Sequence, residues 1–483
     1  MSENDAPAQV PAPTSPDKGS RKSRFRSPRF WLKSLALFAL VYLIAVPFVH
    51  PLLVMAWSVM PIFVLPLIGI PLGLLIARKF RKTGISVVTL AVLATAGVTA
   101  VNFTDWFVDS QIAAYIAPTR VSTMPMSINN RLLPRPTALH YAENSNTDNR
   151  LRVGRPHLLA DPKSDMMYWQ VPLHYDVWYG RILGSTGGVA RVDAGATGQH
   201  AETMPDSGFL YGDESWVADV AFKWLHPFSE KAEVVYWQKD DGSWVILTSY
   251  MSYSPTWTGA MIPVVKGVME ISQNGMIHNY SISEASVRYP GAALFPEKLG
   301  RRYAEAYAKY KHGLVNYWVY QKDLLMISED TSLPDDETGG NHPPFFQDFQ
   351  GMGLQLVAPM EPNGNSSSAL TEVLFFDGIT GKARSFSPTH VPPLNGPRQA
   401  FKNVHKADNQ ADWPDFAALE GKLVTKDHNR YWLFTVIRKD GESHAFVMLV
   451  LVDGYTLDAY KFLSKDELDK FLENAKASDG HQP

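Results

Sequence analysis

The distribution of apolar residues divides the chain into an N-terminal stretch of long hydrophobic runs and a remainder of short ones. Residues 34–77 contain no Asp, Glu, Lys or Arg. A helix needs about 20 apolar residues to cross a bilayer, so this run predicts two spans joined by a tight turn, for which Pro51 and Pro61 are the markers. A third run covers residues 84–101, and its Ala, Thr and Gly residues favour close helix packing. We therefore expect three transmembrane helices within residues 34–102.

Basic residues beside these runs predict the orientation. One cluster lies in the Pro- and Ser-rich residues 1–33, and a second occupies residues 78–82. If the first two runs form a hairpin, both clusters lie on the same side, which the positive-inside rule assigns to the cytoplasm. Everything after about residue 103 is then extracytoplasmic. A re-entrant element in place of the first two spans would leave that part in the cytoplasm. A cleaved signal peptide has a single short apolar region, which does not fit three long runs.

Few polar side chains occur within the apolar runs. His50 is the one that would be costly in the membrane, and an interfacial position for it is favoured over a haem ligand or a proton relay. A single histidine cannot supply a bis-histidine haem site. Trp57, Trp106 and Phe107 stand near the predicted interfaces, as an aromatic belt requires.

Beyond residue 165 the pattern changes to short strand-like runs separated by turns. A recurrent unit begins with a Trp- or Tyr-containing strand and continues with a second strand and a Gly-containing turn. Asn274-Gly275 and Thr380-Gly381 are turn pairs that supply the positive φ of tight hairpins. The copies are residues 168–171 with 188–198, 243–247 with 267–275, and 431–434 with 447–454, and a partial copy covers residues 373–381.

Helical periodicity appears at two places in this strand-rich part. Residues 296–311 begin with Pro296, which suits a first turn, and repeat apolar side chains at helical spacing from Leu299 to Tyr310. Ser464 and Glu467 form a capping box before a second helix at about residues 465–475. The aromatic side chains of the helix at 296–311 are expected to pack on the sheet, and the C-terminal helix has Leu468, Phe471 and Leu472 on one face.

The order of an aromatic strand, a hairpin and Val192-Asp193 followed by Thr197-Gly198 resembles the PepSY type of small α/β hairpin module. The resemblance implies hairpin modules on the outer face of a bacterial membrane protein. PepSY modules place a helix before the hairpin, and the first copy shows none. PepSY-bearing membrane reductases also carry several intramembrane histidines, whereas this chain has only His50. The reductase activity is therefore not transferred.

Together these patterns predict an α+β fold, in which an N-terminal three-helix transmembrane anchor precedes antiparallel β-hairpin repeats with a few packed helices. The expected divisions are a disordered basic cytoplasmic tail (1–33), three transmembrane helices (34–102), a juxtamembrane helix and extended linker (103–165), a first repeat pair with the helix at 296–311 (166–327), a loop-rich middle unit (328–415) and a C-terminal hairpin–helix module (416–476).

Composition narrows the function classes. A formal net charge of −3 argues against a nucleic-acid partner, which would need a basic face. The absence of cysteine excludes disulfides, thiolate nucleophiles and cysteine metal sites. We expect no cofactor and no bound metal. The acidic loop at residues 328–348 has the carboxylates of a calcium site without the spacing of an EF-hand, so a solvated loop is favoured.

The usual catalytic motifs are missing from the sequence. There is no His-Glu-x-x-His pair, no Gly-x-Ser-x-Gly elbow and no phosphate-binding glycine loop. His174 with Asp176 and His157 with Asp161 are possible acid–base pairs, although surface placement is the favoured interpretation. A glycosidase built on two carboxylates stays open, because the distance between them is a property of the fold.

Aromatic residues supply the candidate binding surface. Trp and Tyr are enriched at interface hot spots and can also stack on glycans or peptides. The alternative is that these rings fill the crossover between two strands. The candidates follow the aromatic strands of the first two copies and are Tyr175, Trp178, Tyr179, Tyr250, Tyr253 and Trp257.

The sequence thus predicts a non-enzymatic binding or assembly protein of a bacterial inner membrane, with its large C-terminal part outside the cytoplasm. Its expected partners are the lipid bilayer and a membrane or envelope protein, as a subunit or regulator of an envelope complex. Two alternatives are an enzyme acting on cell-wall glycan or peptide, with His174 or unrecognised carboxylates as catalysts, and an accessory subunit of a transporter.

Overall fold

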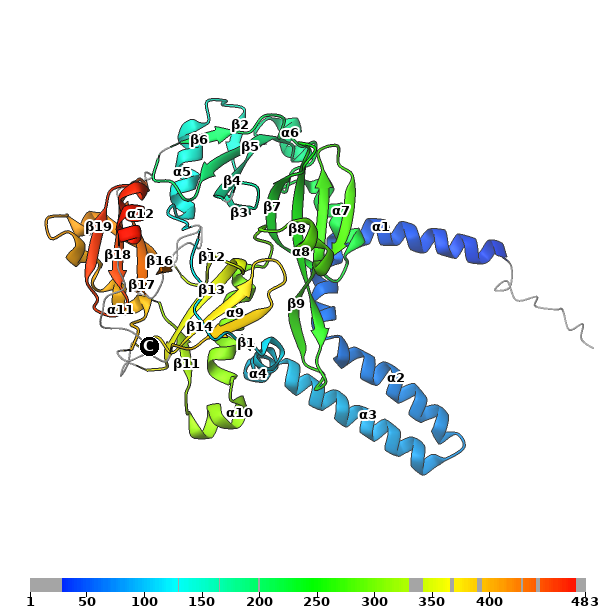
Figure 1. Cartoon of the computed structure of the whole chain (residues 1–483). Coiled ribbons are helices and arrows are strands. Elements are labelled where there is room, and N and C mark those ends of the chain that lie inside the picture. Colours follow the sequence, from blue (N-terminus) through cyan, green and yellow to red (C-terminus); the bar gives the residue numbers. More distant parts are fainter. Residues whose placement is uncertain are drawn as a thin grey trace, which may run out of the picture. The chain divides into compact units, whose positions relative to one another are not determined.

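The computed structural model describes residues 28–128, 130–164, 166–198, 200–329, 342–364, 369–388, 393–426, 429–439 and 444–474. By its internal contacts the chain divides into residues 1–49 and residues 50–483, and the second unit contains all the sheets (Figure 1). Residues 28–33 of the predicted tail belong to the first helix, and the remainder of the tail lies outside the described residues.

Three apolar helices long enough to cross a bilayer follow one another, as predicted: α1 (Pro28–Ser58), α2 (Met60–Ala77) and α3 (Arg81–Asn102). The turn between the first two is shorter than expected, because α1 continues through Pro51 and ends at Ser58. Proline removes one backbone hydrogen bond, a loss that apolar helices tolerate. Pro61 stands in the first turn of α2, where no such bond is lost.

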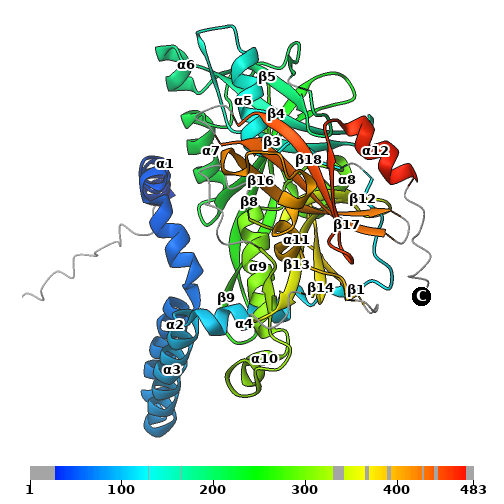
Figure 2. The same ribbon diagram turned by 90° about the vertical axis from the view of Figure 1, so that its left-hand side faces the viewer.

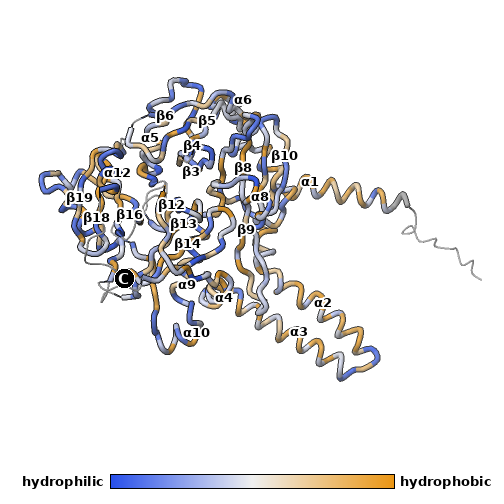
Figure 3. Tube along the Cα trace, viewed as in Figure 1, coloured by the Kyte–Doolittle hydropathy of each residue, from blue (hydrophilic) through white to orange (hydrophobic). Residues whose placement is uncertain are grey.

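Helices α2 and α3 pack along each other as a hairpin, which Figure 2 shows from a second side. A Cβ atom at Gly84 would overlap the backbone of Ala77, and one at Gly73 would lie 2.6 Å from the Val88 side chain. Small residues therefore allow the close approach that replaces hydrophobic burial inside a membrane. The hairpin turn carries Arg78, Lys79, Arg81 and Lys82, and it separates two tubes coloured as hydrophobic in Figure 3.

The segment predicted as a juxtamembrane helix and linker contains more regular structure than expected. Helix α4 (Asp105–Ile116) follows α3 directly, and residues 118–165 hold strand β1 (Thr119–Arg120), helix α5 (Arg135–Ser145) and two strands of the next sheet. The prolines of this stretch, among them Pro118, Pro125, Pro134 and Pro136, indicated an extended linker. Pro134 and Pro136 instead flank the start of α5, where proline is compatible with a helix.

The N-terminal sheet has five strands, in the order β2-β4-β5-β6, with β3 also paired to β4. Its core residue is Trp169, which is fully buried and donates its indole N–H to the Leu133 carbonyl at 2.9 Å. Helix α6 (Trp178–Leu183) joins β4 to β5. The strands are β2 (Leu151–Val153), β3 (His157–Asp161), β4 (Met166–Tyr175), β5 (Thr186–Asp193) and β6 (Ala201–Thr203).

The long-strand sheet has four antiparallel strands in the order β10-β9-β8-β7. Its strands are β7 (Glu230–Gln238), β8 (Trp244–Pro255), β9 (Met261–Ser272) and β10 (Ile277–Ser281). Helix α7 (Trp216–Leu225) precedes it and α8 (Ile282–Arg288) follows it. Ser281 and Glu284 form a complete capping box at the start of α8, which stops the last strand.

The six-stranded sheet gathers distant parts of the chain. Strand β1 pairs in parallel with β15, and the order continues β14-β13-β11, with β12 also paired to β13. The remaining strands are β11 (Leu325–Ile327), β12 (Phe345–Phe349), β13 (Gly353–Pro362), β14 (Glu372–Asp377) and β15 (Ala383–Phe386). Helix α9 (Glu297–Tyr310), predicted at 296–311, packs on it through Leu299 and Tyr303, and α10 (Gly313–Val315) and a π-helical turn, η2 (Asn316–Tyr320), follow.

The C-terminal sheet is a four-stranded meander in the order β16-β17-β18-β19. Its strands are β16 (Phe416–Lys426), β17 (Asn429–Arg438), β18 (Phe446–Asp453) and β19 (Ala459–Phe462). The short helices before it are α11 (Pro397–Phe401), η3 (Val404–Ala407) and η4 (Trp413–Asp415). Helix α12 (Lys465–Asn474) confirms the predicted C-terminal helix, and the Ser464 hydroxyl accepts from the Glu467 backbone N–H at 3.3 Å.

One hydrophobic core joins three of the four sheets. It includes Trp169 from the N-terminal sheet, Ile262 from the long-strand sheet and Leu356 from the six-stranded sheet, together with α4, α5 and α9. A second core joins the six-stranded and C-terminal sheets around Phe375 and Trp432. The predicted α+β fold is confirmed, and each segment identified as a hairpin copy forms antiparallel strands.

Candidate functional site

A cavity of about 550 Å³ lies between α5, α9, strands β7 and β8, the β2–β3 loop and the segment between β11 and β12. Nine of its thirteen lining residues have ionisable side chains, among them five Lys or Arg residues against three glutamates. We call it the charged cavity. Its lining residues are Arg135, Arg155, Lys231, Ala232, Glu233, Met251, Pro296, Glu297, Lys298, Arg301, Glu329, His342 and Pro344.

Local structure explains why these side chains face a common space. Arg135 is the first residue of α5, and the first two turns of α9 supply Glu297, Lys298 and Arg301. Strand β7 contributes Lys231 and Glu233 at a register shift against β8. In a regular strand successive side chains point to opposite faces, and such an irregularity changes the direction in which they point. Two helix starts and one distorted strand thus build most of the wall.

Two arginines of the wall are held by bidentate ion pairs. The Arg135 guanidinium donates to both Glu297 oxygens at 3.0 and 3.1 Å and lies over the Trp169 ring. The Arg301 guanidinium donates to both Glu329 oxygens at 2.7 and 2.9 Å. Bidentate pairs fix geometry as well as charge. These four side chains therefore form a rigid frame rather than a free ligand-binding group.

Two other cations of the wall have no such partner. Within the described residues, neither the Arg155 nor the Lys298 side chain forms an ion pair or a hydrogen bond. Both are solvent-exposed. Lys231 differs, since its ammonium group contacts Asp219 at 3.1 Å. The charged cavity thus presents two cationic groups that are free to bind an anion.

Glu233 is the carboxyl group of the cavity whose protonation is most perturbed. Burial raises its pKa, and the neighbouring Glu297 carboxylate raises it further, while Arg155 and Arg135 act in the opposite direction. Two carboxyl groups that share a site cannot both ionise easily. A protonated Glu233 would leave the cations of the cavity in larger excess and would add an O–H donor to its wall.

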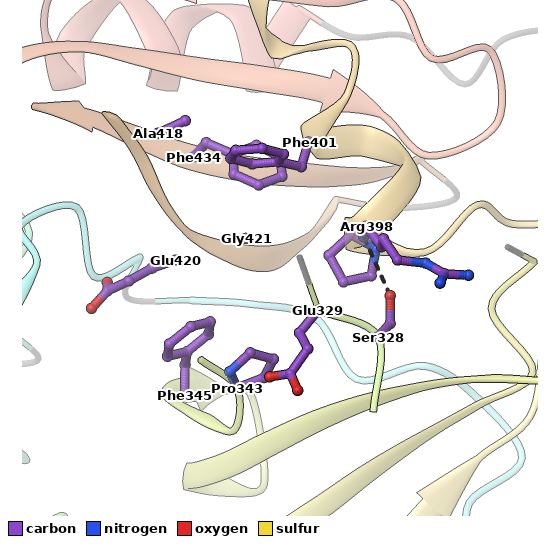
Figure 4. Close-up of a pocket in the computed structure, with 11 residues that line it drawn as sticks. Ser328, Glu329, Pro343, Phe345, Arg398, Phe401, Ala418, Glu420, Gly421 and Phe434 are labelled. Atoms are coloured by element: carbon purple, nitrogen blue, oxygen red, sulfur yellow. Dashed lines mark hydrogen bonds between the residues drawn. The ribbon is translucent and has the colours of Figure 1, made fainter. Parts of the chain in front are cut away.

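A much smaller cavity, of about 30 Å³, adjoins the same region and also contacts Glu329 (Figure 4). In its wall the Arg398 backbone N–H donates to the Ser328 hydroxyl at 3.3 Å, and the Arg398 guanidinium pairs with the buried Glu361 at 2.8 Å. Burial raises the pKa of Glu361, whereas Ser328 and Arg398 lower it. A space of this size holds one or two water molecules and no larger ligand.

The first group of predicted aromatic binding residues lies at the end of β4 and the start of α6. Tyr175 is half-buried at the end of β4, and the Trp178 side chain is 76% exposed. Tyr179 follows it in α6, and its side chain lies outside the described part. No described contact joins this group to the second one.

The second aromatic group lies along β8 and in the turn after it. The Tyr250 ring packs on His226 with 4.1 Å between ring centres, and its pKa is raised by burial. Tyr253 is half-buried, and its carbonyl accepts a hydrogen bond from the Trp57 indole at 3.1 Å. Trp257, in the β8–β9 turn, is 94% exposed. Among these residues, Trp257 alone presents an open aromatic face.

The two candidate catalytic histidines, His157 and His174, share one carboxylate neighbour, which is neither of the aspartates that the sequence suggested. His157 Nε2 lies 3.8 Å and His174 Nε2 lies 3.5 Å from the Asp213 carboxylate, which also accepts from the Tyr236 hydroxyl at 2.7 Å. Asp161 and Asp176 instead bind neighbouring loop residues and Arg181. Asp213 is distant in sequence, so spacing could not reveal it. The side chains of His157, His174, Asp213 and Tyr236 are all largely buried, and none of them lines the charged cavity.

Within the described residues no group of three or more His, Asp or Glu side chains is arranged to hold a metal ion. Most of the acidic loop considered for calcium, residues 330–341, lies outside the described residues. Comparisons with protein-family models, with curated proteins and with solved structures gave no match to this chain.

Proposed function

We propose that this chain is a membrane-anchored binding protein whose charged cavity takes an anionic ligand, such as a carboxylate- or phosphate-bearing small molecule or peptide end. The observation that carries this proposal is the pair of free cations, Arg155 and Lys298, in a cavity of about 550 Å³. That volume lies in the usual range for small-molecule sites. The fixed pairs Arg135–Glu297 and Arg301–Glu329 supply a frame that needs no rearrangement on binding.

Charge-assisted hydrogen bonds to the two free cations would supply most of the specificity. Replacing both, as Arg155→Gln with Lys298→Gln, is expected to weaken anion binding at least about tenfold, since each bond to a charged group contributes roughly 1.5–3 kcal/mol. Calorimetric titration of the full chain in detergent with inorganic phosphate, pyrophosphate and citrate, at constant ionic strength, would measure this change.

A matched control removes the same charge elsewhere. Lys406→Gln with Lys470→Gln replaces two exposed lysines of η3 and α12 that do not line the cavity. Equal losses in both double variants would show general charge attraction and contradict the cavity proposal. Binding to the wild-type chain should also strengthen as the pH falls toward the titration of Glu233, because its pKa is raised.

We further propose that the soluble part lies outside the cytoplasm of a bacterial cell. The support is the basic turn between α2 and α3, which the positive-inside rule places in the cytoplasm, while the start of α2 and the end of α3 lie on the opposite side. Alkaline phosphatase fused after residue 110 or at the C-terminus should be active, and the enzyme fused after residue 33 or 82 should be inactive. An inactive C-terminal fusion with an active cytoplasmic reporter at the same site would contradict this topology.

A ligand-binding body on an anchor fits a subunit or regulator of an envelope complex. The three apolar helices leave a membrane-facing surface on which a second membrane protein can pack. Crosslinking in the native membrane would identify such a partner. Recovery of the chain without a crosslinked protein would count against a complex.

A further inference from the structure

The end of α3 is joined firmly to one turn of the soluble body. The Asn102 amide donates to the Gly259 carbonyl at 2.9 Å, and its side-chain oxygen accepts from the Met261 backbone N–H at 2.8 Å. Gly259 has a positive φ of 82°, which the tight turn between β8 and β9 requires. The β8–β9 turn therefore lies at the level where the apolar helix ends.

The same turn presents Trp257, whose side chain is 94% exposed. A second fixed point lies in the last turn of α1, just before α2 begins. There the Trp57 ring stacks on Phe228 at 5.0 Å and its indole N–H donates to the Tyr253 carbonyl. The orientation of the β8–β9 hairpin toward the ends of α2 and α3 is thus set by several specific contacts.

A second apolar segment reaches the same level. The eight residues of α10 and η2 contain no charge and expose Val315, Trp318, Val319 and Tyr320. The Trp318 ring meets Trp106, four residues beyond the end of α3, with 5.9 Å between ring centres. Figures 1 and 2 both place α10 beside α4, on the side of the body from which α2 and α3 extend.

We propose that Trp257 and the α10–η2 segment insert into the interfacial layer of the same bilayer that α2 and α3 cross. Trp and Tyr concentrate at this layer, because an amphipathic ring is stable between headgroups and acyl chains. Lys309, His312 and Lys322 flank the segment and can reach lipid phosphates. An exposed apolar cluster of this kind is uncommon on a surface that faces only water.

The bilayer, rather than a protein, is the occupant that the structure favours. Both apolar elements lie beside residues that directly continue a membrane span, so lipid surrounds them without any partner having to be recruited. The insertion would add two membrane contacts, Trp257 and the α10–η2 segment, to those of the helices and would restrict tilting of the soluble body against the membrane. This inference does not depend on the ligand of the charged cavity.

The absence of cysteine in the chain allows a direct test. Single variants Trp257→Cys and Val319→Cys, labelled with an environment-sensitive fluorophore, are reconstituted as full chains in vesicles of phosphatidylethanolamine and phosphatidylglycerol. A blue shift and strong quenching by lipids brominated on their acyl chains are expected at both positions. Ile182→Cys is the matched control, since Ile182 is an exposed residue of α6, at the opposite end of the body in Figures 1 and 2.

Each outcome decides the proposal. Quenching at positions 257 and 319, without quenching at 182, supports insertion. Labels at 257 and 319 that stay water-accessible in vesicles overturn it. Labels that become buried without lipid quenching, and that transfer energy to a second labelled copy or crosslink to another protein, show a protein occupant and also overturn it.

Discussion

Replacing Glu420 with Gln should destabilise the protein by about 3–5 kcal/mol, the usual cost of removing one partner from a buried ion pair. Among the described residues, Glu420 is the single anion paired with two buried cations, Arg131 and Lys422, and each cation lies 2.9 Å from its carboxylate. All three side chains are at most 3% exposed. The substitution would leave two positive charges facing each other in the interior.

The cost should depend on pH in a defined direction. Burial lowers the pKa of Lys422 to about 8, and Glu420 opposes that shift. Without Glu420 the lysine can lose its proton more easily, whereas Arg131 cannot. The destabilisation of Glu420→Gln should therefore grow as the pH falls from 9 to 6, which urea unfolding of the detergent-solubilised chain would measure.

Two further variants control this experiment. Lys422→Met keeps the Arg131–Glu420 pair intact and should cost much less than Glu420→Gln, because no charge is left unpaired. Glu143→Gln changes an exposed residue of α5 and should have almost no effect. A Glu420→Gln protein as stable as the wild type would mean that water reaches this network.

Individual elements of the fold could be predicted from the sequence where one physical signal dominates. Charge-free runs longer than a bilayer core define α1, α2 and α3, since no other fold of such a run is stable in lipid. The β8–β9 and β9–β10 hairpins follow from apolar runs separated by glycine turns, and Gly275 has the positive φ of 85° that Asn274-Gly275 indicated. Helices α9 and α12 follow from periodicity and capping.

Residues 118–165 show where sequence patterns fail. The segment is polar and rich in proline, so it predicts a linker, yet Arg131 and Arg135 are buried against the Trp169 ring. Their charges are satisfied by Glu420 and Glu297, which lie far along the chain. The sequence does not show whether an arginine is buried or exposed, because that depends on the residue that pairs with it in the folded structure.

The charged cavity was missed for the same reason. Arg155, Glu233 and Lys298 occur singly in a loop, a strand and a helix start, and no spacing connects them. The aromatic positions were identified, but not what they contact. Tyr250 packs on His226, whereas Trp257 packs on nothing in the described part of the chain. Sequence shows that aromatic residues cluster, and only the fold separates core rings from surface rings.

Acid is expected to destabilise the protein through His157. Burial lowers the pKa of this histidine to about 4, with Asp213 raising it and with Arg155, Arg135 and His174 lowering it. In the unfolded chain a histidine has a pKa of about 6.5. The unfolded state therefore binds a proton first, so the contribution of His157 to stability is complete above about pH 6.5 and is lost as the pH falls toward 4.

The size of this effect follows from the two pKa values. Between pH 7.5 and pH 5 the wild-type chain should lose about 2 kcal/mol of unfolding free energy through this group alone. Glu233 acts in the opposite sense, because its raised pKa makes the folded state bind the extra proton. The comparison must therefore be between the wild type and His157→Gln at each pH, in which the Glu233 contribution cancels.

The difference in unfolding free energy between wild type and His157→Gln should shrink by about 2 kcal/mol from pH 7.5 to pH 5, since the variant has nothing to protonate at this position. His405→Gln is the control, because His405 is exposed on η3 and its replacement should leave the pH dependence unchanged. A constant difference would contradict the lowered pKa of His157, and a difference that grows as the pH falls would mean that Asp213, at 3.8 Å, holds His157 protonated in the folded protein. The buried His157–Asp213–His174 group would then be an ionic cluster instead of a neutral one.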